Sequence, residues 1–85
     1  MDIRCSICQE PTDNDELHYV AEDEGRTYRE VYRDFVANGC VAVYGGTPCE
    51  PAGNPLIAMA IYDLMGDDVD GAASMWEDAE VMGLL

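Results

Sequence analysis

Cys5-Ser6-Ile7-Cys8 places a C-x2-C doublet near the start of the chain, and Cys40 and Cys49 are the only other cysteines. Four cysteines in 85 residues, two of them at this spacing, predict one tetrahedral site in which every ligand is a thiolate. Such a site leaves no open position for a substrate, so we expect it to be structural. Zn²⁺ is the expected ion, with Cys5, Cys8, Cys40 and Cys49 as its ligands. Two disulfides, free thiols or an iron ion are the alternatives.

The length and the hydrophobic content predict one small folded domain. A chain of 85 residues buries only a modest core, so a metal ion is a useful cross-link. A structural Zn²⁺ site supplies about 10 to 16 kcal/mol of apparent binding energy, which is comparable to the whole net stability of a small domain. Hydrophobic residues make up 48% of the sequence, which is too many for a disordered acidic tail. No signal peptide and no apolar run of membrane length is visible, which predicts a cytoplasmic protein with reduced cysteines and no contact with membranes.

Acidic residues dominate the charge. The sequence has 18 Asp and Glu against four Arg and no Lys, for a formal net charge of −14, and no basic residue follows Arg33. Binding to nucleic acid needs Lys or Arg against the phosphates, so nucleic acid is not an expected partner. The acidity fits a solubilising or salt-adapted surface, a surface that attracts a basic protein, or a surface that binds cations.

The clearest helix signal lies in the middle of the chain. Thr27 and Glu30 stand at the two ends of a capping box, in which each side chain satisfies a free backbone amide. Apolar residues then recur at helical spacing, which predicts a helix over 28–38 that ends at Gly39 in a left-handed cap.

Weaker signals predict the remaining elements. Asn54-Pro55 is a typical helix start, and the helix is expected to run to Gly66. A last helix is predicted to begin at about residue 69 or 70 and to end at residue 82. The short apolar runs 17–20 and 41–44 are predicted to be strands.

Together these elements predict a small α-rich (α+β) domain stapled by zinc, with an N-terminal cysteine knuckle, a central helix and a C-terminal helical hairpin. We expect residues 1–85 to form a single domain. Residues 1–53 would hold the knuckle and the central helix, and residues 54–85 would form an acidic helical hairpin.

Two alternatives concern the ligand residues. The doublet is also the motif of thiol-disulfide enzymes, but those enzymes place it at the start of a helix that follows a strand, in a longer α/β pattern than this chain offers. His18 is the only histidine and could replace one cysteine as a ligand. With four thiols at hand, we expect it to be a partly exposed residue beside the knuckle.

Two further alternatives concern the acidic C-terminal part. Residues 66–71 resemble part of an EF-hand loop that would use Asp68, Asp70 and Glu77, but Gly66 stands where the first calcium ligand is needed. Residues 56–85 also resemble a helix-turn-helix, but acidic side chains on its second helix would repel the DNA backbone. An acidic helix start and a packed helical hairpin are therefore the favoured interpretations.

Two resemblances to known families follow from these motifs. The stretch from Cys5 to Pro11, with Leu17 and His18, resembles the opening zinc knuckle of HNH-type nucleases and other treble-clef domains, but the catalytic histidines and asparagine of those nucleases have no counterpart after His18. The order of motifs along the chain resembles small acidic zinc-knuckle accessory proteins encoded by phages of actinobacteria. That resemblance implies a role in binding a host protein.

We therefore expect a zinc-binding protein that acts by protein contact and is not an enzyme. No lysine, one histidine and no glycine-rich phosphate loop leave no catalytic set. The expected partner is a basic protein surface, such as one that normally holds nucleic acid in a host enzyme. A purely structural zinc domain with a solubilising surface is the alternative, and a thiol-disulfide enzyme comes third. The predicted partner-binding residues are Asp67, Asp68, Asp70, Trp76, Glu77, Asp78 and Glu80, with a place in the core as the alternative for Trp76.

Overall fold

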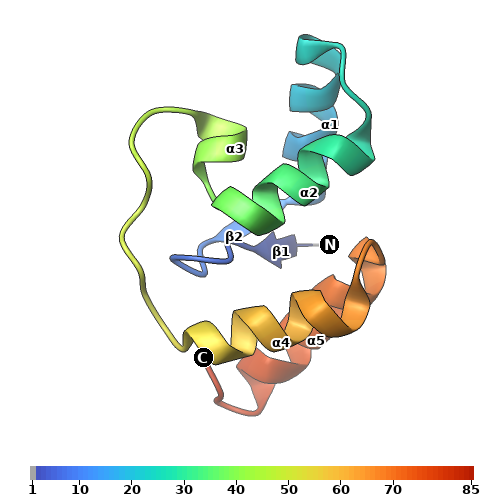
Figure 1. The fold of residues 1–85 in the computed structure, drawn as a ribbon. Helices are drawn as coiled ribbons and strands as arrows, with labels where there is room; N and C mark the ends of the chain where they lie inside the picture. The colour runs from blue at the N-terminus through green and yellow to red at the C-terminus, as the bar shows by residue number, and fades with distance from the viewer. Residues whose placement is uncertain (1) are drawn as a thin grey trace.

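A β-hairpin opens the fold and lies between two groups of helices (Figure 1). In this computed structural model, which describes residues 2–85, strand β1 (Asp2–Arg4) pairs antiparallel with β2 (Pro11–Asp13). Ile3 stands opposite Thr12, and both side chains are buried. Sequence analysis did not predict this hairpin, because each strand has only three residues.

Helix α1 (Asn14–Glu24) follows the hairpin directly. The strand predicted over 17–20 is therefore wrong. Asp13 caps the helix by accepting a hydrogen bond from the amide of Asp15, and Gly25 ends it in the left-handed conformation. Leu17 and Ala21 turn inward at helical spacing, which is the signal that the strand prediction overlooked.

Helix α2 (Tyr28–Asn38) confirms the predicted central helix, and both hydrogen bonds of the Thr27–Glu30 capping box are present. It buries Val31, Tyr32 and Phe35.

The strand predicted over 41–44 is also wrong, because this stretch forms the single-turn helix α3 (Val41–Tyr44). The turn after α2 puts Cys40 in the right-handed helical region, and within residues 2–85 the strands β1 and β2 pair only with each other. The amides of Val43, Tyr44 and Gly45 therefore bond to carbonyls three or four residues back.

Helices α4 (Pro55–Met65) and α5 (Val69–Val81) form the predicted helical hairpin below the strands in Figure 1. Asn54 caps α4, and Asp68 caps α5 by accepting from the amide of Gly71. Helix α5 packs against β1, so the C-terminal hairpin is joined to the N-terminal part. Helix α4 is also linked to β1, because the hydroxyl of Tyr62 donates a hydrogen bond to the carbonyl of Arg4.

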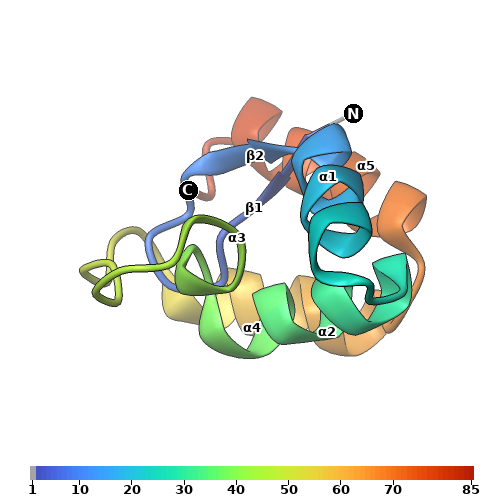
Figure 2. The same cartoon turned by 90° about the horizontal axis from the view of Figure 1, so that it is seen from above.

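One core runs through both groups of helices. Figure 2 shows the same arrangement from above, with α2 and α4 overlapping in projection and α5 beside the hairpin. An aromatic series crosses this core, in which Tyr32 meets the edge of Tyr62 and Tyr62 meets the edge of Trp76. Within residues 2–85, none of the helices has both the length and the apolar character that a membrane span requires.

Candidate metal centre

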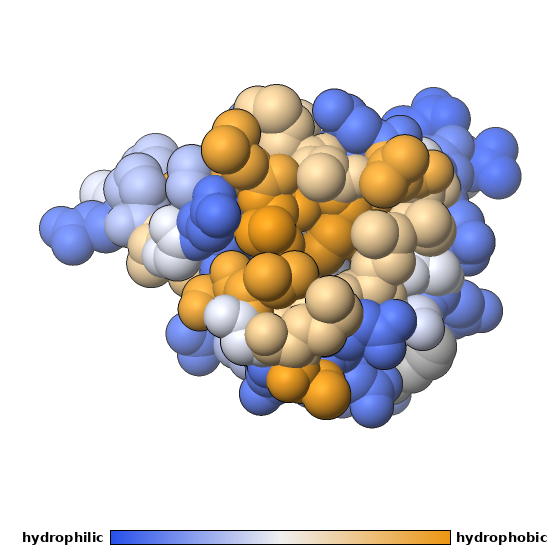
Figure 3. Space-filling model, turned by 90° about the horizontal axis from the view of Figure 1, so that it is seen from below, coloured by the Kyte–Doolittle hydropathy of each residue, from blue (hydrophilic) through white to orange (hydrophobic). Residues whose placement is uncertain are grey.

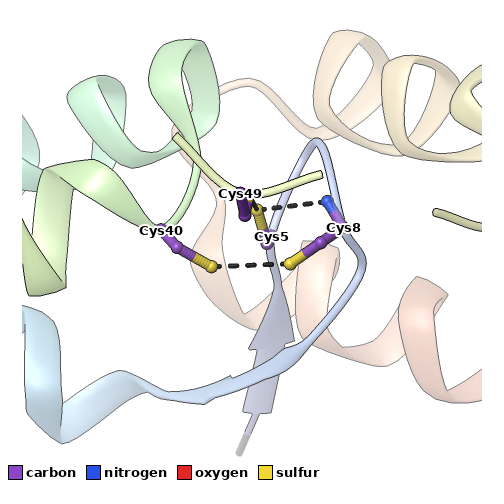
Figure 4. A group of neighbouring side chains, drawn as sticks. All are labelled: Cys5, Cys8, Cys40 and Cys49. Carbon is purple, nitrogen blue, oxygen red and sulfur yellow. Dashed lines mark hydrogen bonds between the residues drawn. The ribbon is translucent and has the colours of Figure 1, made fainter. Parts of the chain in front are cut away.

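The four cysteines come from three separate places in the fold and meet at one point (Figure 4). Cys5 follows β1, Cys8 lies in the turn of the hairpin, and Cys40 joins α2 to α3. Cys49 comes from the loop between α3 and α4. Their sulfur atoms all lie within 4.8 Å of one another.

The sulfur positions fit a tetrahedral metal site. Cys5 Sγ lies 3.6 Å from Cys49 Sγ, and Cys8 Sγ lies 3.5 Å from Cys40 Sγ. A Zn–S bond of about 2.3 Å gives a sulfur tetrahedron with edges of roughly 3.8 Å. A disulfide would need about 2.05 Å, and all four cysteines are free. The arrangement is therefore that of thiols which can hold one metal ion.

The hairpin turn supplies amide donors to the sulfur of Cys5. The amides of Ile7 and Cys8 donate to Cys5 Sγ at 3.3 and 3.4 Å. The turn itself is closed by the Cys5 amide on the Glu10 carbonyl and by the Gln9 amide on the Cys5 carbonyl, each at 3.1 Å. The doublet thus presents both sulfurs to the same side of a tight loop.

These contacts favour ionisation of the Cys5 thiol. Burial alone would raise the pKa of Cys5. Hydrogen bonds from the amides of Cys8 and Ile7 and from the neighbouring thiols of Cys40 and Cys49 lower it by more, so the pKa falls to about 7. Burial raises the pKa of Cys40, and its contacts with Cys5 and Cys8 raise it more, because a second thiolate would be repelled by the first. A divalent cation among the sulfurs would remove that repulsion.

Gly39 allows α2 to approach the knuckle. Its φ of 75° and ψ of −146° lie in a region that only glycine occupies readily, which differs in ψ from the left-handed cap predicted for this residue. A Cβ atom at this position would stand 2.7 Å from Cys5 Sγ and 3.2 Å from Ile7 Cδ1. The end of α2 therefore reaches Cys5 only because residue 39 has no side chain.

Gln9 connects the knuckle to the loop before α4. It is buried, and its Nε2 donates to the carbonyl of Asn54 at 2.7 Å. The amide of Ala52 donates to the carbonyl of Ile7 at 3.1 Å. Gln9 has a positive φ of 61°, which is uncommon for a residue other than glycine. Sequence analysis did not single out Gln9, because nothing in its neighbours indicates this backbone conformation.

His18 is not a member of the sulfur cluster. It is exposed on α1 and stacks on Tyr28 with ring centroids 4.2 Å apart. Over residues 2–85, the four cysteines are the only group of three or more metal-ligating side chains close enough to share an ion. The calcium alternative therefore finds no support, since Asp68 is used as the cap of α5 and Asp67 binds arginines.

The acidic residues proposed to bind a partner are exposed, but several already have contacts. Asp67 accepts from Arg33 at 2.8 Å and lies 3.7 Å from Arg29, and its hydrogen bond with Arg33 holds its pKa below the usual range. Glu80 accepts from Arg4 at 2.8 Å. Within residues 2–85, four of the predicted residues form no ion pair, namely Asp68, Asp70, Glu77 and Asp78.

Trp76 must be removed from the predicted partner-binding set. Its side chain is only 1% exposed and lies in the core beside Tyr62. The i, i+3, i+4 pattern of Ala72, Ala73, Trp76 and Ala79 puts it on the buried face of α5. Its alternative place in the core is the correct one.

Comparisons with known protein families, with curated proteins and with solved structures gave no match for this chain.

Proposed function

We propose that this chain is a zinc-binding module that acts by binding another protein and is not an enzyme. The observation that carries the zinc part is the closed cluster of four sulfurs, in which no ligand position is left for a substrate. The observation that carries the partner part is the net charge of −14, with no cation after Arg33.

The surroundings of the doublet support a structural metal over redox catalysis. Reactive C-x2-C pairs stand at a helix N-terminus, where the helix dipole stabilises the thiolate. Here Cys5 and Cys8 lie in a hairpin turn that leads into β2, and Cys5 is fully buried. Zn²⁺ suits this set of four soft ligands and has no redox chemistry of its own, whereas iron would add a redox function for which nothing else in the chain provides.

The partner in this proposal is a basic protein surface in the cytoplasm of a host cell. A surface that normally binds nucleic acid, as in a host nucleic-acid enzyme, is rich in Lys and Arg and would be attracted by the exposed carboxylates of α5. The resemblance to accessory proteins of actinobacterial phages motivates the host. A purely structural zinc domain with a solubilising surface is the second candidate, favoured by the ion pairs that already occupy Asp67 and Glu80.

Metal analysis tests the first part of the proposal. Protein purified without added metal should contain one Zn²⁺ per chain by mass spectrometry of the metals, and the Cys49→Ser variant should contain much less. The matched control is Ser74→Ala, which changes an exposed residue of α5. A compact wild-type protein that contains no metal would contradict the zinc assignment.

Capture of partners tests the second part. The zinc-loaded protein should retain basic proteins from a lysate of the host, and moderate salt should release them because screening shortens the reach of exposed charges. Replacing Asp70, Glu77 and Asp78 by their amides should weaken this retention. If the amide variant retains the same proteins to the same extent, the acidic surface is not the binding surface. That result would favour the alternative of a purely structural zinc domain.

A further inference from the structure

Helix α4 carries large apolar side chains on its outer side as well as on its buried side. Leu56, Met59 and Leu64 are 68%, 60% and 71% exposed. At the end of α5 and beyond it, Val81, Met82 and Leu84 are also exposed. Figure 3 shows hydrophobic atoms gathered over the face that α4 and α5 present below the molecule. A contiguous face of this kind marks an interaction surface more often than chance exposure does.

The two helices leave a groove along this face. Its volume is about 310 Å³, and its lining includes Ile57 and Ala60 from α4, Met75 from α5, and Met82 and Leu84 from the segment after α5. Asp78 is the one charged side chain among the lining residues. Methionine side chains adapt to different partner shapes, which suits them to a binding groove.

The one charge that lines the groove is negative. Asp78 lies in the groove itself, whereas Asp63 lines a separate hollow of about 320 Å³ that α4 shares with Val36 and Ala37 of α2. Helices α4 and α5 contain no Lys or Arg, and each arginine in residues 2–85 forms an ion pair with a residue that does not line the groove. An occupant must therefore supply both apolar side chains and positive charge.

These charges argue against a second copy of the chain as the occupant. A symmetric dimer through this groove would bring Asp78 of both copies together with no cation on either α4 or α5. Each copy also carries a formal charge of −14, so the two chains would repel each other.

We propose that the groove between α4 and α5 binds an amphipathic basic helix of a partner protein. Apolar side chains of that helix enter between Ile57, Met75 and Met82, and a Lys or Arg side chain beside them meets Asp78. A helix fits because the groove runs between two helices, and its lining from Met75 to Met82 extends over about 11 Å, or two helical turns. This inference rests on the proposed function as a protein-binding module and identifies where the partner docks.

The test uses the zinc-loaded protein and two synthetic peptides. Both contain only Leu and Lys, in equal number and at a length of about 14 residues, but only one has its leucines at i, i+3, i+4 and i+7. Binding is measured by fluorescence anisotropy of the labelled peptide, and the mass of the protein is measured by light scattering over a range of concentrations. The groove variant is Met82→Ser with Leu84→Ser, which changes two exposed side chains that line the groove. The matched control is Tyr19→Ser, which changes a side chain of similar exposure (66%) on α1.

The expected result is saturable binding of the amphipathic peptide that the groove variant weakens by about tenfold or more and the control variant leaves unchanged. Asp78→Asn should weaken it further at low salt. If both peptides bind equally and the groove variant has no effect, the groove inference is overturned while the acidic binding function stands. If neither peptide binds, the groove inference and the proposed binding of basic partners are both overturned. If the wild-type protein dimerises and the groove variant does not, the occupant is a second copy and the inference is wrong.

Discussion

Replacing Gly39 by alanine should weaken metal binding far more than an alanine at another glycine with the same backbone conformation. The new Cβ would lie 2.7 Å from Cys5 Sγ, so the sulfur must move by roughly 1 Å to restore an ordinary contact. A metal site tolerates shifts of only about 0.2 Å in its ligand distances. We therefore expect a loss of metal affinity of about 10- to 100-fold, or about 1.4 to 2.7 kcal/mol, as for other disturbances of the surroundings of a metal.

Gly45 provides the matched control for this substitution. Its φ of 68° and ψ of −163° lie close to those of Gly39, but a Cβ atom there would meet nothing within 4 Å. Both variants bear the backbone strain of alanine in this region, about 1 to 3 kcal/mol, and only Gly39→Ala also displaces Cys5.

Competition with a zinc chelator gives the metal affinity, and thermal unfolding with and without zinc gives the stability. The reasoning is refuted if Gly39→Ala and Gly45→Ala lose the same amount of metal affinity. Such a result would mean that the approach of α2 to Cys5 does not matter for the site.

Four further outcomes are expected. Removal of the metal by a chelator should shift the fluorescence of the buried Trp76 to longer wavelength, because unfolding exposes the indole, and added Zn²⁺ should reverse the shift. Metal affinity should fall as the pH is lowered from 8 to about 6, since protons compete for Cys5, whose pKa is about 7, and for the other thiols. Thr27→Ala should lower the free energy of unfolding by about 1 kcal/mol in chemical denaturation, because α2 loses its capping hydrogen bond. The pKa of Asp67 is lowered in the folded state by its hydrogen bond with Arg33, so the ion pair stabilises the fold above the ordinary carboxyl range. That stabilisation is lost as the pH falls through the folded pKa, and the free energy of unfolding of an Asp67→Asn variant should fall less over the same pH range.

Local sequence patterns predicted the parts of the fold that depend on neighbouring residues. The capping box at Thr27, the Asn54-Pro55 start and the C-x2-C doublet each express a physical requirement within a few residues, and the structure has a helix start or a sulfur ligand at each. The strand prediction over 41–44 failed because β-branched residues indicate strands only where another strand is available for pairing.

The exposed groove was harder to predict for a different reason. Helix α4 is apolar nearly all the way round, so its sequence does not indicate which side faces the core and which faces outward. The structure puts Ile61 and Tyr62 inside and leaves Leu56 and Leu64 outside. For Trp76 the sequence does contain a signal, because the alanines at helical spacing around it are typical of a buried face.

All four cysteines of the sulfur cluster lie within the first 49 residues, whereas α4 and α5 come later in the chain. During synthesis, a nascent chain therefore has its complete set of thiols before the ribosome has made the helices that cover β1. If the ion binds at that stage, β1 and the knuckle are folded before α5 packs against them. The N-terminal part would then fold first, in the same order in which it is synthesised.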